Sequence, residues 1–119
     1  MTLTCQAAPN CRGWLLLKLG RLRIELWKVP AQTEIPPHNH PNIISRIIFL
    51  NGNMLVSRAG SRKRWPTKLI RWYRLNPGQE HYGRAAFGDG WFLNIEHWVG
   101  PMESKGSAAA DWDAPQDLY

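Results

Sequence analysis

The sequence has 119 residues, of which 44% are hydrophobic, and this length and composition suffice for one domain with one core. No apolar run approaches the roughly 20 residues that a membrane-spanning helix needs, and we find no signal-peptide pattern, so we expect a cytoplasmic protein without membrane contact. The net charge is +6, but residues 1–100 carry fourteen Lys and Arg against five acidic residues, whereas residues 101–119 carry one against four. This basic part is compatible with nucleic acid or an anionic substrate as a partner.

Short apolar segments separated by turn residues predict an all-β fold. Residues 21–29 alternate strictly between polar and apolar side chains, a period of two that is typical of a half-buried strand. Residues 43–50 are rich in β-branched side chains and are followed by Asn51-Gly52 and a second apolar run at 53–57. Asn-Gly between two such runs predicts a hairpin with a type I′ turn. Further strands are expected within 15–19, 68–75 and 91–99.

The chain shows no amphipathic helix of normal length, and strands at this spacing are typical of a sandwich or a small barrel. We therefore expect a single domain over residues 1–100 with a short irregular N-terminal segment. Residues 101–119 are small, polar and acidic, which predicts a flexible tail. Cys5 and Cys11 match no zinc-ligand spacing, and we expect two reduced thiols, with a disulfide or an interchain contact as the alternatives.

Three histidines stand at positions that favour a common site. His38 and His40 flank a single residue, and in an extended chain the side chains of residues i and i+2 point the same way. His81 follows the turn signal Pro77-Gly78 and enters a later strand. Imidazole is a ligand of Fe, Zn, Ni and Cu, and three protein ligands with an open position make a catalytic metal site. The pattern therefore predicts a metal site formed by His38, His40 and His81.

The first of these segments resembles the first motif of the cupin family. That motif places a Glu after His-x-His with four residues in between, and then a Gly with six more residues in between. In this chain His38-Asn-His40 is followed at the corresponding positions by Ser45 and Gly52. The family's Glu is therefore replaced by Ser45, so the site is either a three-histidine site or one completed by another group, unless it has lost its metal. Candidates for such a group are Glu34, Asn39, Glu80 and water.

The second segment resembles the second cupin motif, a Pro/Gly turn followed after two residues by His. Gly78-Gln-Glu-His81 matches it, although the Pro is displaced to position 77 and the closing Asn is Ala85. The resemblance covers about residues 20–100. It implies a small double-stranded β-helix barrel, of the cupin or jelly-roll type, with the three histidines inside its open end. It also implies a divalent transition metal such as Fe, Zn, Ni or Mn.

Six further residues are weaker candidates for function. His97 is a general acid/base or a structural histidine, and Tyr73 and Tyr82 are proton donors or packing aromatics. Candidates for substrate binding are Ser45, Arg46 and Arg71, which otherwise fill the barrel or face solvent. The basic segment 58–68 contains Trp65 and is compatible with nucleic-acid binding or with a solvated loop.

These observations support one leading hypothesis and two alternatives. The leading hypothesis is a metal-dependent cupin that acts on a small polar or anionic molecule, by dioxygenase chemistry or by isomerase or lyase chemistry. The alternatives are a non-catalytic cupin that binds a sugar-like molecule and nucleic-acid association through residues 58–68. A homodimer is expected, because the resemblance implies pairing through the sheets and because a small barrel has exposed edge strands.

Overall fold

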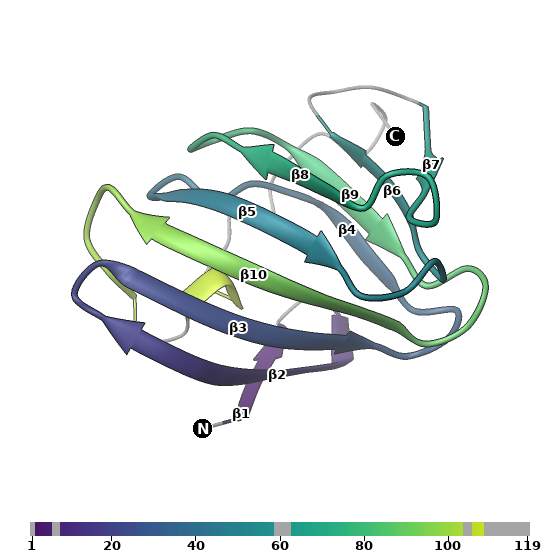
Figure 1. Ribbon diagram of the computed structural model, residues 1–119, viewed down its shortest axis with the longest axis horizontal. Helices are drawn as coiled ribbons and strands as arrows, with labels where there is room; N and C mark the ends of the chain where they lie inside the picture. Colours follow the sequence, from purple (N-terminus) through teal and green to yellow (C-terminus); the bar gives the residue numbers. More distant parts are fainter. Residues whose placement is uncertain (1, 6–7, 59–62, 104–105, 109–119) are drawn as a thin grey trace.

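The computed structural model describes residues 2–5, 8–58, 63–103 and 106–108, which form two antiparallel β-sheets that face each other (Figure 1). One sheet has six strands in the order β1-β2-β3-β10-β5-β8, and the other has four in the order β4-β9-β6-β7. The strands are β1 (Thr2–Cys5), β2 (Ala8–Leu19), β3 (Leu22–Val29), β4 (Glu34–His38), β5 (Ile43–Phe49), β6 (Leu55–Arg58), β7 (Trp65–Pro66), β8 (Trp72–Leu75), β9 (His81–Arg84) and β10 (Gly90–Trp98).

The described residues contain no α-helix, and their one helical element is the 3₁₀ turn η1 (Gly106–Ala108). This turn packs against β1 and β10 and lies behind β3 and β10 in Figure 1, on the side that faces the second sheet. The all-β prediction is confirmed, whereas the N-terminal segment that was expected to be irregular forms β1 and β2. The described residues also include no helix with the length and hydrophobicity that crossing a membrane requires.

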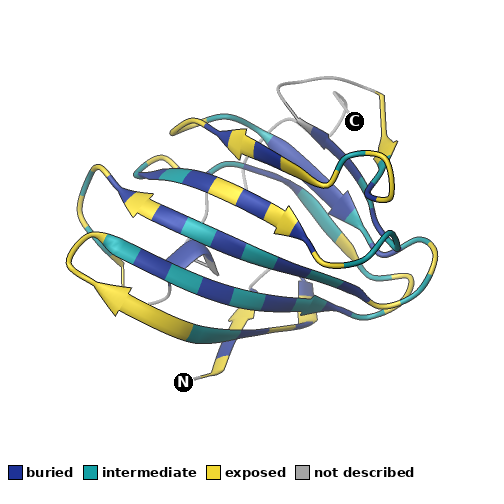
Figure 2. Ribbon diagram, viewed as in Figure 1, coloured by how far each residue is buried: buried dark blue, intermediate teal, exposed yellow. Residues whose placement is uncertain are grey.

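The core lies between the sheets and is formed by side chains that alternate along each strand. Figure 2 shows this alternation along β3 and β10, which pair with Leu26 opposite Leu93 and Glu25 opposite Asn94. The period of two places Trp27 and Phe92 in the core, because both stand on the inward face of their strands. Other buried members of this core are Leu3, Val29, Ile47, Phe49, Met54, Val56, Tyr73 and Leu75.

The strand predicted within residues 21–29 is confirmed as β3, but its inward face is the one that carries charge. Arg23 and Glu25 are 2% and 0% exposed, respectively, whereas Leu22, Ile24 and Leu26 are half-buried on the opposite face. The polar face is tolerated inside because Arg23 and Glu25 pair with each other and share their face with Trp27 and Val29.

The hairpin predicted at Asn51-Gly52 is wrong. The strands before and after it, β5 and β6, belong to different sheets, and neither residue has a positive φ. The chain instead turns a corner from one sheet to the other. The corner is held by Asn51, whose Nδ2 donates to the Asp89 carbonyl at 2.9 Å and whose carbonyl accepts from Thr67 Oγ1 at 3.0 Å. Gly52 is needed for close packing, since an added Cβ would lie 2.7 Å from the Lys68 Cβ.

Part of the segment predicted as a flexible tail is buried. Ser107, in η1, is 8% exposed and contacts residues of the barrel interior. The flexibility predicted for the rest of the segment concerns mainly residues 104–105 and 109–119, which lie outside the described residues. Cys5 and Cys11 are both buried, and no disulfide joins them.

The contact between Gly13 and Trp27 leads to a test of the packing. A Cβ on residue 13 would lie 2.6–2.8 Å from three atoms of the indole ring, which is itself fixed in the core. We expect Gly13→Ala to lower the free energy of unfolding by about 1–3 kcal/mol, because the ring has to move. Urea unfolding followed by tryptophan fluorescence measures this change. Lys18→Ala, at an exposed position of the same strand, should change stability by less than about 0.5 kcal/mol; equal effects would contradict the packing argument.

Candidate metal centre

The three histidines are brought together by the pairing of β4 with β9. His38 ends β4, His81 begins β9, and the two residues are directly opposite each other in the ladder. Pro36 and Pro37 fit into β4 because it is an edge strand, and the ladder is irregular between Ile35 and His38. His40 follows β4, and its carbonyl accepts a hydrogen bond from Gly78 N at 3.1 Å, which ties the two histidine-bearing loops together.

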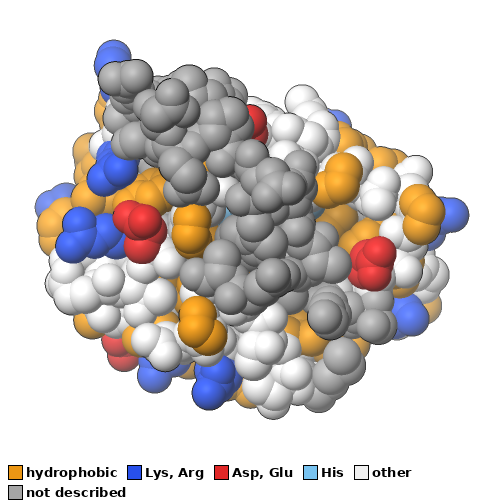
Figure 3. Space-filling view, turned by 180° about the vertical axis from the view of Figure 1, so that it is seen from behind, with side chains coloured by type: hydrophobic (Ala, Val, Ile, Leu, Met, Phe, Trp, Pro, Cys, Tyr) orange, Lys and Arg blue, Asp and Glu red, His pale blue; other side chains and the backbone are white. Residues whose placement is uncertain are grey.

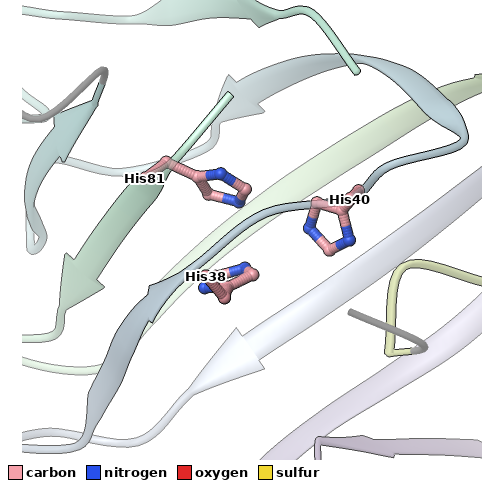
Figure 4. Close-up of side chains that lie close together, drawn as sticks. All are labelled: His38, His40 and His81. Carbon is pink, nitrogen blue, oxygen red and sulfur yellow. The ribbon is translucent and has the colours of Figure 1, made fainter. Parts of the chain in front are cut away.

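The imidazole rings converge on one point (Figure 4). The ring centroids of His38 and His81 are 4.0 Å apart, and the His40 centroid lies 4.9 Å from that of His38 and 5.0 Å from that of His81. One potential ligand atom from each histidine lies within 4.8 Å of the others. All three side chains are buried, with 5–6% of each residue exposed. Among the described residues, the cluster of potential metal ligands contains these histidines and no carboxylate.

Backbone carbonyls orient two of the rings. His38 Nδ1 lies 2.8 Å from the Pro36 carbonyl, and His81 Nδ1 lies 3.1 Å from the Gln79 carbonyl. Because a carbonyl only accepts, each Nδ1 carries the hydrogen, and the lone pair of each Nε2 is left for a ligand. His40 Nδ1 is buried without a hydrogen-bond partner. Two oriented imidazoles and a third buried imidazole suit a transition-metal ion as ligands, so these residues fit the metal that the resemblance implies.

Burial keeps the three histidines neutral. Desolvation is the main cause that lowers the pKa of His81 to about 4 and the pKa values of His38 and His40 well below 6.5. Repulsion from neighbouring histidines lowers the pKa values of His38 and His40 further. The neutral form is the one that binds a metal, so no proton has to be displaced at neutral pH.

The histidines form part of the wall of a cavity of about 60 Å³. This volume has room for about four to six water molecules, or for a molecule with a similar number of non-hydrogen atoms. The polar groups in its wall besides the histidines come from Tyr73, Tyr82, Asn94 and Ser107. The remaining wall is mostly apolar, and includes Ile35, Ile47, Phe49, Met54, Val56 and Phe92.

Three of the weaker candidates are inside the barrel. Tyr73 and Tyr82 both line the cavity, and Tyr82 Oη donates to Glu34 Oε2 at 2.7 Å. Burial and this contact raise the pKa of Tyr82 to about 12, so it remains a hydrogen-bond donor at neutral pH. Ser45 is 1% exposed, stands opposite Glu96 on the neighbouring strand, and its buried Oγ has no hydrogen-bond partner.

The other three weaker candidates do not reach the cavity. His97 is exposed on β10, on the face that points away from the second sheet, and Arg46 has the same position on β5. Arg71 is exposed just before β8. The structure therefore offers no support for a role of these residues in chemistry at the histidines.

The basic segment 58–68 is described only in part, since residues 59–62 lie outside the described residues. Lys63 and Arg64 are exposed, and Trp65 is 46% exposed in β7. The Arg64 guanidinium lies 4.4 Å from the centroid of the Tyr82 ring, so this cation already has an aromatic partner within the chain. Nucleic-acid binding through the segment stays a prediction.

Sequence reasoning missed a second polar cluster inside the barrel, formed by Arg23, Glu25 and Glu96 with Asn94 and Ser107 beside them. A signal was present, because Glu-x-Trp occurs twice, at residues 25–27 and 96–98. In each case the Trp Nε1 donates to the carboxylate two residues earlier on the same strand face, at 2.9 and 3.0 Å. The Glu-x-Trp repeat therefore indicates two inward-facing carboxyl groups, those of Glu25 and Glu96.

Comparison with known proteins supports the fold. No protein-family model and no curated protein matches the sequence. The structure of DMSP lyase DddQ from Ruegeria pomeroyi DSS-3 matches with a TM-score of 0.73 and 18% identity, covering 98% of this chain and 62% of that one. A cupin 2 conserved barrel domain protein from Rhodopseudomonas palustris matches with a TM-score of 0.67 and 11% identity, covering 87% and 74%. A predicted oxalate decarboxylase from Thermotoga maritima matches with a TM-score of 0.66 and 16% identity, covering 83% and 91%.

These structures share with the chain the double-stranded β-helix fold of the cupins. The fold implied by the resemblance of the histidine motifs is thereby confirmed. At these sequence identities the likeness concerns the fold, and function has to be argued from the residues of the site.

The lowered pKa values predict how the stability of the metal-free protein depends on pH. Between about pH 4 and 6.5 the unfolded histidines bind protons that the folded ones do not, so stability is full above pH 6.5 and decreases as the pH falls. The slope is at most about 1.4 kcal/mol per pH unit for each histidine. We expect His81→Gln to make this slope shallower in urea unfolding with a chelator present. An unchanged slope in His81→Gln would contradict the assignment.

Proposed function

We propose that the protein is a metal-dependent cupin in which His38, His40 and His81 hold a divalent transition metal and a small polar or anionic molecule binds in the adjoining cavity. The observation that carries this proposal is the convergence of three buried, neutral imidazoles whose ligand atoms lie within 4.8 Å of one another. Iron, zinc, nickel and manganese are all compatible with such a ligand set.

The bound ion would supply dioxygen chemistry if it is iron, or act as a Lewis acid in an isomerase or lyase reaction if it is zinc, nickel or manganese. The chain's own residues add three properties. Three neutral ligands leave the full charge of the ion in place, which favours an anionic group in the open position. Most of the lining is apolar, which disfavours water beside the ion, and Tyr73 and Tyr82 are among the lining residues.

Among these reaction classes we propose lyase chemistry. Two of the solved structures with this fold are described as a DMSP lyase and a predicted oxalate decarboxylase. The cavity of about 60 Å³ also favours a molecule of a few non-hydrogen atoms over a sugar. The sugar-like ligand of the non-catalytic alternative would require the cavity to widen.

Elemental analysis tests the metal site directly. We expect about one equivalent of one transition metal per chain in untagged protein, and a loss of at least about tenfold in metal affinity in His81→Ala, because one of three ligands is removed. The measurement is inductively coupled plasma mass spectrometry after equilibrium dialysis.

His97→Ala is the matched control, since it removes an exposed histidine on the opposite face of the sheet and should keep the full metal content. Wild-type protein that also failed to bind added iron, zinc, nickel and manganese would refute the metal-dependent function.

We also propose that two copies pair through the outer face of the six-stranded sheet. This face is the broad front surface in Figure 2, and its side chains are mostly apolar and half-buried or exposed. Trp14 and Trp91 stack on it with centroids 6.0 Å apart. Its other apolar members include Leu17, Leu22, Ile24, Leu26, Ile44, Ile48, Leu93 and Ile95. On the opposite side of the molecule, hydrophobic side chains are scattered among Lys and Arg (Figure 3).

A contiguous apolar sheet face of this kind is typical of a subunit interface. We expect Ile24→Lys to convert a dimer to a monomer in sedimentation velocity, because it places a charge at the centre of the face. Phe87→Lys, which alters a 62% exposed side chain in the loop before β10, should leave the dimer intact. A wild-type chain that sediments as a monomer would refute the pairing. Two cysteines without a disulfide are compatible with the reducing cytoplasm, which we retain as the proposed location.

A further inference from the structure

A second group of charged side chains lies inside the barrel, on the inward face of β3 and β10. Arg23, Glu25 and Glu96 are 2%, 0% and 0% exposed, respectively. Arg23 Nη2 lies 3.1 Å from Glu25 Oε2, and Arg23 Nε lies 3.7 Å from Glu96 Oε1. Two carboxyl groups thus share one guanidinium where no solvent reaches them.

Neutral donors complete the shell around the two carboxyl groups. The indole nitrogens of Trp27 and Trp98 donate to Glu25 and Glu96, respectively. Ser107 contacts both, since its Oγ donates to Glu25 Oε1 at 2.5 Å and its backbone N–H donates to Glu96 Oε2 at 3.2 Å. None of these donors carries a charge, so the cluster lacks one positive charge if both carboxyl groups are ionised.

A proton supplies the missing charge in the absence of a ligand. Burial, and after it the contact with Glu25, raise the pKa of Glu96 to about 9, so at neutral pH this carboxyl group is protonated. The cluster then has one guanidinium, one carboxylate and one neutral carboxyl group. A bound cation could replace the proton without leaving a net charge in the interior.

The cluster adjoins the cavity of the histidines through two residues. Asn94 and Ser107 both line that cavity, and each also contacts a carboxyl group of the cluster. Asn94 is 2% exposed, and its buried Oδ1 has no hydrogen-bond partner, while its Nδ2 lies 3.5 Å from Glu96 Oε2. The lining of the cavity therefore includes the three histidines, a carboxamide and a serine, and the rest of it is mostly apolar.

We infer that the cavity takes a small zwitterion of the amino-acid type, whose carboxylate meets the ion on the three histidines and whose protonated amine binds at Asn94 and Ser107. The ammonium group donates to Asn94 Oδ1 and Ser107 Oγ. Its positive charge replaces the charge of the proton on the Glu96 carboxyl group. That proton leaves to solvent, and no covalent bond of the ligand changes. The carboxylate end rests on the proposed metal site, whereas the amine end rests on the cluster.

Three probes of similar size separate the two ends of the ligand. β-Alanine carries a carboxylate and an ammonium group, 3-hydroxypropionate replaces the ammonium by a neutral hydroxyl, and butyrate replaces it by a methyl group. We expect zinc-loaded protein to bind β-alanine at least about tenfold more tightly than either of the others, because a charged hydrogen bond in a buried site outweighs a neutral one.

Isothermal titration calorimetry at pH 7, in two buffers of different ionisation enthalpy, also counts protons. We expect β-alanine to release about one proton per molecule bound and butyrate to release none. The other titratable groups at the cavity are the three histidines, Cys5, Cys11, Tyr73 and Tyr82. These groups are present whichever probe binds. A difference between the probes in the number of protons released therefore reports on the carboxyl groups of Glu25 and Glu96.

Glu96→Gln is the matched variant, because a neutral amide replaces the carboxyl group and leaves Arg23 and Glu25 balanced. It should bind zinc, lose the preference for β-alanine and release no proton. Ser107→Ala removes the proposed contact of the ammonium group with Ser107 Oγ. Because Ser107 lies in a turn outside the sheets, this variant replaces Glu96→Gln if that variant does not fold. Zinc-loaded protein that binds β-alanine no better than 3-hydroxypropionate, or that binds none of the probes, overturns the inference alone. Protein that does not bind zinc overturns the proposed function with it.

Discussion

The free-energy cost of placing a charge inside a narrow barrel determines the protonation state of the ionisable side chains that the described part of this protein buries. Two groups of ionisable side chains are shut away from water, and they reach neutrality in different ways. His38, His40 and His81 lose their protons, since burial lowers their pKa values. Arg23, Glu25 and Glu96 keep a guanidinium against one carboxylate and hold a proton on the second carboxyl group.

These two groups give the lining of the cavity two kinds of polar side chain. Neutral imidazoles present lone pairs to a cation, whereas Asn94 and Ser107 present oxygen atoms backed by carboxyl groups. The rest of the lining is largely apolar and adds few polar contacts of its own. A ligand is consequently selected by what it carries at its two ends and by its length, more than by the number of its hydroxyl groups.

The sequence allowed the histidine site to be predicted because its signals are local. His-x-His in extended chain and a histidine after a Pro-Gly turn keep their meaning whichever strands surround them. The carboxyl cluster was not predicted, since it depends on which strand lies beside β3. Glu25 and Glu96 are far apart in the sequence and meet only through the pairing of β3 with β10. The Asn51-Gly52 prediction failed for the same reason, because a local turn signal cannot tell a hairpin from a passage between sheets.

In β3 the charged face points inward and the face with the leucines points outward. This arrangement affects how the strand reaches the correct alignment with β10. A shift of β3 by one residue against β10 would turn its other face inward. That face carries Leu22, Ile24 and Leu26, so the core would still be lined with apolar side chains. Hydrophobicity alone therefore distinguishes the two alignments poorly. The shifted alignment would separate Arg23 from Glu96 and turn Trp27 away from the core. We infer that the buried charged groups of Arg23, Glu25 and Glu96 determine the alignment of β3. They add little to the stability of the correct alignment, but they raise the free energy of the shifted one.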